Sequence, residues 1–153
     1  MSTDLDTKMR INNLLESQLF CVLTTNLKDS NFPYSSLIAF FHTLDLKHIY
    51  FATSRKTTKF TNLLSDPKAC IFFDNRSNEL EDVIETVSAT VLGKVKELDK
   101  EKETKLISQF TDKYPQLEDF VHNIDTAFLQ VLVDEYVVVF NFQKVLRLKI
   151  EDS

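Results

Sequence analysis

The stretch from His48 to Ser65, HIYFATSRKTTKFTNLLS, passes from a strand pattern to a helix pattern within a few residues. Its opening, HIYFAT, is rich in the β-branched and aromatic side chains that favour strands. From Thr57 onward apolar residues recur at the three- to four-residue spacing of an amphipathic helix, and Asp66-Pro67 ends the pattern. We therefore predict a strand that leads directly into a short helix.

The junction between these two elements concentrates hydroxyl groups and cations. Its members are Thr53, Ser54, Arg55, Lys56, Thr57, Thr58 and Lys59. A helix N-terminus carries unpaired backbone N–H groups and the positive end of the helix dipole, so added cations make it suitable for a phosphate even without glycine. The same residues also fit a simpler arrangement, in which Thr57 caps the helix and the cations point into solvent. Both interpretations are open at this point.

The segments on either side predict a mainly β chain with one domain, residues 1–153. Strands are expected at 19–25, 33–42, 48–53, 69–73, 86–96, 127–133, 136–141 and 145–150, with turns at 134–135 and 142–144. Helices are expected at 4–17, 57–65 and 99–123, the last capped by Asp99 and broken at Tyr114-Pro115. Residues 74–82 read as a polar loop. This order predicts a small antiparallel barrel with helices packed outside it.

The composition excludes several classes of function. The chain has 153 residues, with 18 Lys and Arg against 23 Asp and Glu, and its net charge of −5 is opposite to that of a nucleic-acid-binding surface. Gly93 is the single glycine, which excludes glycine-rich Walker and dinucleotide-binding loops. No apolar run approaches the ~20 residues of a membrane span. Cys21 and Cys70 lie in apolar runs without a CxxC partner, so we expect a cytoplasmic protein with neither nucleic acid nor membrane as partner.

No residue stands out as a catalyst or a metal ligand. His42, His48 and His122 are scattered, without the HxxxH or HExxH spacing of a metal site. The two cysteines fall within predicted strands, where a free cysteine is usually a small buried apolar residue. The carboxylates of the polar loop are typical of a solvated surface. We expect no metal site, and the catalytic residues are unknown.

From Ile11 to about Lys96 the order of segments resembles the pyridoxamine-phosphate-oxidase-like family of FMN-binding split barrels. The matching segments are LFCVLTT, PYSSLIAFF, IYFAT followed by TTK, NLLSDPKACIFF and VSATVLGKVKEL. The resemblance implies an antiparallel split β-barrel of the FMN-binding type. It also implies a homodimer, with the flavin at the subunit interface, and a small-molecule substrate.

The resemblance assigns particular residues to the cofactor. The matching positions are Ser36, Leu37, Ile38, Thr53, Ser54, Thr57, Thr58, Lys59 and Ser88. Residues 53–59 correspond to the phosphate site, residues 36–38 to the strand beside the flavin ring, and Ser88 to a position near the dimer interface. Where the family often has a second basic residue this chain has Thr58, a loss of charge that Arg55 or Lys56 could offset.

Three functions are compatible with these features. The first is an FMN-dependent oxidoreductase acting on an unidentified small substrate. The second is a flavin or haem binding or storage module without turnover, and the third is a structural protein that has lost its cofactor. Oxidation of pyridoxamine phosphate itself is not expected, because the C-terminal VLRLKIEDS lacks the Trp and Pro that accompany the substrate-gripping Arg of those enzymes. Arg147 alternates with leucines there, as a solvent-facing strand residue does.

Overall fold

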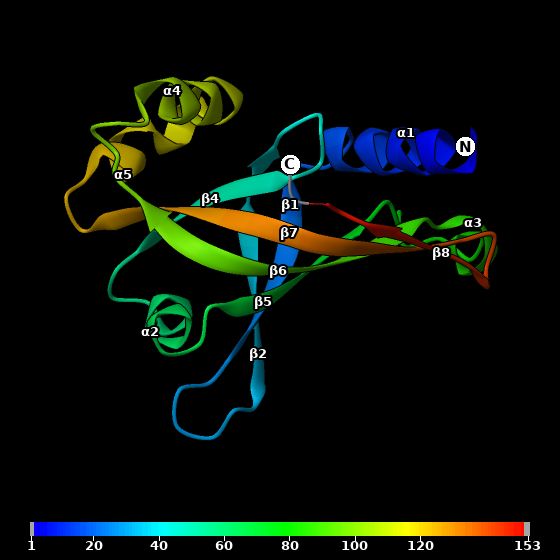
Figure 1. Cartoon of the computed structure of the whole chain (residues 1–153), viewed down its shortest axis with the longest axis horizontal. Coiled ribbons are helices and arrows are strands. Elements are labelled where there is room, and N and C mark those ends of the chain that lie inside the picture. Colours follow the sequence, from blue (N-terminus) through cyan, green and yellow to red (C-terminus); the bar gives the residue numbers. More distant parts are fainter. Residues whose placement is uncertain (1, 152–153) are drawn as a thin grey trace.

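A computed structural model describes residues 2–151, with side chains from residue 4 onward, and shows one curled antiparallel sheet flanked by helices (Figure 1). The strands are β1 (Phe20–Asn26), β2 (Pro33–Ala39), β3 (Phe41–His42), β4 (His48–Ser54), β5 (Lys68–Asp74), β6 (Ser88–Leu98), β7 (Thr126–Phe140) and β8 (Lys144–Lys149). They pair in the order β2-β1-β5-β6-β7-β4-β3, with β8 added to β7. The prediction of a mainly β, antiparallel protein is confirmed.

Helices flank this sheet. They are α1 (Ser2–Glu16), α2 (Thr58–Ser65), α3 (Asp82–Glu85), α4 (Thr104–Lys113) and α5 (Glu118–His122), with a 3-10 turn at Pro115–Leu117. In Figure 1, α4 and α5 lie at one end of the sheet, while α3 and the turn between β7 and β8 lie at the other. No helix in the described part of the chain is long and apolar enough to span a bilayer.

The sheet curls until its two ends meet at Phe40. β2 ends at Ala39 and β3 begins at Phe41, although these strands stand at opposite ends of the strand order. The buried backbone N–H and carbonyl of Phe40 are therefore hydrogen-bonded by side chains and not by a neighbouring strand. The Tyr114 hydroxyl accepts its N–H at 3.1 Å and donates to its carbonyl at 2.6 Å, and Lys113 Nζ donates to the same carbonyl at 2.9 Å. This closure gives the expected split barrel and divides the single strand that was predicted here.

β6 and β7 form the longest strand pair. The predicted turn at Asp134 and Glu135 is wrong, because β7 runs unbroken through both residues. The pairing register shifts between Leu92 and Gly93, which makes Asp134 the extra residue of a β-bulge. Glycine is needed at the bulge, since a Cβ on Gly93 would lie 2.6 Å from the carbonyl oxygen of Leu132.

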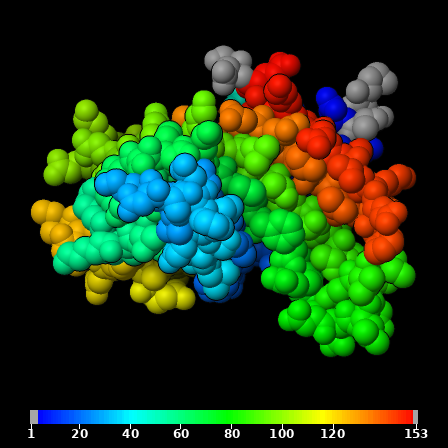
Figure 2. Space-filling view, turned by 90° about the horizontal axis from the view of Figure 1, so that it is seen from below, coloured from blue at the N-terminus to red at the C-terminus, as the bar shows by residue number. Residues whose placement is uncertain are grey.

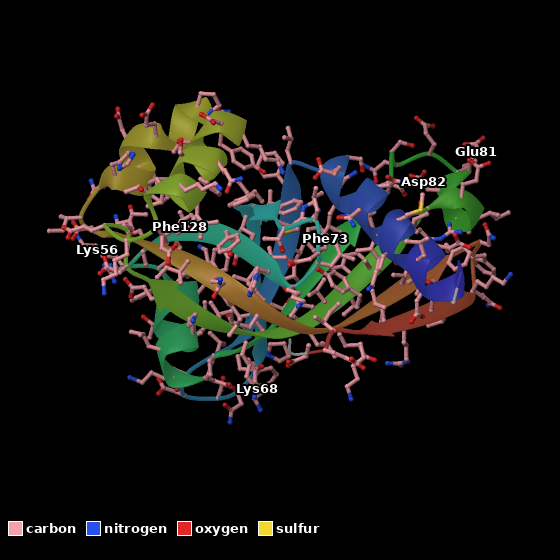
Figure 3. All side chains as sticks on the ribbon, turned by 45° about the horizontal axis from the view of Figure 1, so that its top comes forward. Lys56, Lys68, Phe73, Glu81, Asp82 and Phe128 are labelled. Atoms are coloured by element: carbon pink, nitrogen blue, oxygen red, sulfur yellow. The ribbon has the colours of Figure 1, made fainter. Side chains whose placement is uncertain are left out.

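Apolar side chains form one core inside the barrel and a second layer outside it. The inner core joins alternate strand residues to one face of α1, and the outer layer packs α4 and α5 against the sheet. In the outer layer the Phe128 ring stacks on Tyr50 at 5.9 Å and meets Phe110 edge-on at 5.8 Å. Figure 3 places Phe73 within the curl and Phe128 at the end covered by α4 and α5.

One helix boundary and one extra helix differ from the prediction. α4 begins at Thr104 and not at Asp99, because the Asp99 carboxylate accepts the N–H of Glu101 at 3.0 Å and closes a separate turn. The single turn α3 follows the polar loop and was not predicted. Its residues lack the length and periodicity of an amphipathic helix, so no helical pattern is present there.

Candidate functional site

The junction between β4 and α2 is a rigid turn. Thr57 caps α2, with its Oγ1 accepting the N–H of Phe60 at 3.3 Å and donating to the carbonyl of Ser54 at 2.9 Å. The buried Thr53 hydroxyl lies 3.0 Å from Thr57 Oγ1, and since the Thr57 proton is already used, Thr53 is the donor. The capping interpretation of Thr57 is therefore correct. Thr53 and Thr57 shape the turn with hydroxyls that are occupied within the protein.

Two of the three junction cations have an acidic partner outside α2. The Arg55 guanidinium forms a bidentate pair with Glu97 of β6, at 2.9 and 2.5 Å. The backbone N–H of Arg55 donates to the carbonyl of Asp125 at 2.8 Å. The Lys56 ammonium lies 4.0 Å from the Asp125 carboxylate, and the Lys56 side chain is 82% exposed. Arg55 is therefore not available to replace the positive charge that is missing at Thr58. Lys56 could replace it only from an exposed position.

Lys59 differs from both. It is half-buried in the first turn of α2, and burial lowers the pKa of its ammonium group. Its ammonium group has no hydrogen bond or ion pair with any residue from 4 to 151. The backbone N–H groups of Thr58 and Lys59 occupy the first two helical positions, which no carbonyl of the helix can reach. A desolvated, unpaired cation beside free N–H donors is suited to an anion.

The turn between β1 and β2 forms the other wall of a cavity beside this junction. Asn62 of α2 is 1% exposed and ties the two together, since its Nδ2 donates to Thr25 Oγ1 at 3.0 Å and its Oδ1 accepts the N–H of Lys28 at 3.2 Å. The cavity has a volume of about 330 Å³, and its lining includes Lys28, Ser30, Lys56, Thr58 and Thr61. Sequence reasoning missed Asn62 and Lys28. Asn62 could have been noticed as a polar residue within the apolar face of the predicted helix at 57–65.

The three residues expected beside the flavin ring face different ways. Ile38 is 5% exposed and belongs to the inner core, whereas Leu37 is 67% exposed on the outer face. The Ser36 Oγ is buried without a hydrogen-bond partner in the described part of the chain. β2 is an edge strand, so one side of its backbone is unpaired in the sheet. A ring beside this strand would meet backbone groups and Leu37.

Ser88 lies far from the predicted site residues of the β4–α2 junction. It begins β6, whose other end, Leu98, pairs with Phe128, and Phe128 pairs with Ala52 beside Thr53. Ten residues of strand separate Ser88 from Leu98, roughly 30 Å at 3.3 Å per residue. One chain therefore does not bring Ser88 to the β4–α2 junction.

Other reactive side chains are not grouped. Among residues 4–151, no three His, Cys, Asp or Glu side chains gather as metal ligands would. Burial raises the pKa of the Cys21 thiol far above its ordinary value, so it stays protonated. His42 is buried, with Nε2 at 3.1 Å from Asn12 Oδ1. Within the described residues, the half-buried, unpaired Lys59 beside the free N–H groups at the start of α2 remains as the candidate site.

The curled antiparallel sheet and the strand-to-helix junction define a split-barrel protein. A family model for pyridoxamine 5'-phosphate oxidase matches residues 7–147, and the chain belongs to this family. A search among curated proteins finds no match.

Solved structures share the fold at low sequence identity. General Stress Protein 26 from Bacillus anthracis aligns with a TM-score of 0.70 and 20% identity, over 93% of this chain and 98% of its own. HutZ, described as the haem storage protein of Vibrio cholerae, aligns with a TM-score of 0.72 and 13% identity, over 90% of this chain and 92% of its own. A haem-binding protein from Mycobacterium smegmatis aligns with 0.81 and 15% identity over 93% of this chain, which spans 57% of its length. These likenesses show the fold alone.

Proposed function

We propose that this chain binds FMN and acts as a flavin oxidoreductase on a small molecule. The observation that carries the proposal is Lys59, a half-buried cation without a partner among the described residues. The FMN phosphate is a dianion, and the Lys59 ammonium with the N–H groups of Thr58 and Lys59 would supply charge-assisted donors for it. Ser54, Thr53 and Thr57 would hold the turn in place. When bound, FMN supplies the redox chemistry.

The flavin ring would lie along the free edge of β2. Backbone groups of Ser36, Leu37 and Ile38 would provide its polar contacts, and the exposed Leu37 side chain an apolar surface. Because Ser88 is roughly 30 Å from the junction along β6, we assign it to the site of a second copy, in a homodimer. A cytoplasmic location is part of this proposal, since both cysteines are free thiols.

Haem binding is the competing function. Haem iron is commonly held by an imidazole. His42 is buried and bonded to Asn12, which leaves the half-buried His48 and the exposed His122 as candidate ligands. Neither lies at the β4–α2 junction. The unpaired Lys59 beside free helix N–H groups therefore supports FMN over haem bound through these histidines.

Binding of three compounds to the purified protein tests the proposal. FMN, riboflavin and haemin are each titrated, with flavin fluorescence and the haem Soret band as signals. We expect FMN to bind most tightly. Haemin binding without FMN binding would favour the storage module, and binding of none would favour the structural protein. Flavin reduction by NADH or NADPH, followed by reoxidation with candidate acceptors, then separates an enzyme from a carrier.

A further inference from the structure

The segment between β5 and β6, residues 75–86, forms a projecting arm. The Asp82 carboxylate shapes it by accepting the N–H groups of Ser77, Asn78 and Glu79 at 2.7, 2.6 and 3.2 Å. Its apolar side chains face solvent: Leu80 is 88% exposed, Val83 65% and Ile84 64%. Figure 2 shows this green segment standing out from one end of the molecule. A shaped, exposed apolar element is typical of an interaction site.

The arm is also acidic. Glu79, Glu81, Asp82 and Glu85 carry its negative charges. Its one cation, Arg76, lies 2.9 Å from the carboxylate of Asp74 and is already paired. A partner for the arm must therefore offer an apolar surface beside positive charge.

The outer face of the sheet offers both. Lys68 of β5 stands directly opposite Lys94 of β6, and like charges in such a pair are destabilising. Both lysines are exposed, and neither forms an ion pair within the described residues. On the same face Phe72 is 37% exposed and Leu92 42%. Asp66 offers Lys68 a partial counter-charge, since hydrogen bonds from Asn26 and the Lys68 N–H, together with the Lys68 charge, lower the pKa of the Asp66 carboxyl. The arm would bring further negative charge to both lysines.

The two features lie at opposite ends of the same strand pair. The register of β5 and β6 runs from Lys68 opposite Lys94 to Asp74 opposite Ser88, where the arm begins, a span of about 20 Å. Consider two copies packed with these faces together, related by a two-fold axis that crosses the middle of β5 and β6. The arm end of each copy then lies opposite the lysine end of the other. Phe72 and Leu92 lie near the middle.

We propose that, in the homodimer on which this inference rests, the arm of each copy docks on the lysine pair of the other. Leu80, Val83 and Ile84 then pack toward the outer face, with Glu81 and its neighbours beside Lys68 and Lys94. The exchange also carries Ser88, which adjoins the arm, toward the β2 and α2 end of the partner. The partner copy thereby contributes to the candidate FMN site.

A charge swap tests the docking. The Glu81 side chain makes no capping hydrogen bond, so Glu81→Lys leaves the arm intact, and Lys94→Glu changes an exposed strand residue. Each single variant should weaken the dimer by about tenfold or more in sedimentation equilibrium. The double variant should return to within about threefold of wild type. Lys105→Glu, on the exposed face of α4, is the matched control and should change little.

Several outcomes would overturn the docking. They are a monomeric wild type, single variants that behave like Lys105→Glu, and a double variant at least as weak as both singles together. Circular dichroism of each variant confirms that it is folded. FMN titration of the wild type is run in parallel. A dimer that passes the charge swap without binding FMN contradicts the cofactor alone, and FMN binding without the charge effect contradicts the docking alone.

Discussion

Thr53 and Thr57 bring their hydroxyl oxygens to 3.0 Å of each other, which ties the end of β4 to the cap of α2. The contact holds the turn between them, and the turn sets where the first N–H groups of the helix point. Lys59 stands two residues after the cap, half-buried and unpaired among the described residues. Two hydroxyls used within the protein thus hold the turn that leads to the unpaired Lys59.

Removing the cap should lower stability. Thr57→Ala deletes the oxygen that accepts the Phe60 N–H, and loss of an N-cap costs ~0.5–2 kcal/mol in the free energy of unfolding. Thr58→Ala, at the exposed first position of the helix, is the control and should stay within about 0.5 kcal/mol. Urea unfolding measures both. Equal stability of the two variants would show that the Thr57 hydroxyl contributes nothing.

Tyr114 should be needed for barrel closure. Tyr114→Phe removes the hydroxyl that meets the N–H and carbonyl of Phe40 and lies 2.7 Å from the carbonyl of Leu19. An unsatisfied buried donor costs ~1–3 kcal/mol, so the free energy of unfolding should fall by that amount. Tyr34→Phe, at a tyrosine that is 38% exposed, should be near neutral. A Tyr114→Phe variant as stable as that control would contradict this role.

His42 should make stability depend on pH. Burial lowers its pKa from 6.5, Glu16 raises it and Lys113 lowers it, so the folded value lies below the unfolded one. The unfolded state then binds more protons as the pH falls below 6.5, and stability decreases from there down through the folded pKa. His42→Gln should flatten this slope between pH 7.5 and 5 in urea titrations. The exposed His122→Gln is the control, and an unchanged slope in His42→Gln would refute the assignment.

Turnover of pyridoxamine phosphate should be negligible. The prediction that Arg147 faces solvent is confirmed, since its side chain is 66% exposed and lies 3.7 Å from Glu135. Arg147 is therefore turned to solvent beside Glu135 and is not placed to grip a second phosphate dianion. Pyridoxal phosphate formation under air with saturating FMN measures this. Turnover well above a free-FMN control would show that the substrate phosphate finds another site.

The sequence predicted the β4–α2 junction because a change of hydrophobic period and a Thr cap are local signals. It failed at Asp134, where turn-forming residues sit in a strand whose bulge is set by the close approach of Gly93 to Leu132. It also could not place Ser88, since the distance of that residue from Thr53 depends on how the whole sheet pairs. Asn62 and the Arg55–Glu97 pair were missed for the same reason, because both join segments far apart in the chain.

The central claim is that Lys59 binds the phosphate of FMN, and a four-way comparison of affinities tests it most directly. FMN and riboflavin, which differ by that phosphate, are each titrated into wild type and Lys59→Ala, with Lys144→Ala as a surface control. Lys59→Ala should weaken the binding of FMN by ~1–3 kcal/mol, about 5- to 150-fold in affinity. The affinity for riboflavin should stay within about twofold of wild type, and Lys144→Ala should change neither affinity. An equal loss for riboflavin, or no loss for FMN, would contradict the account.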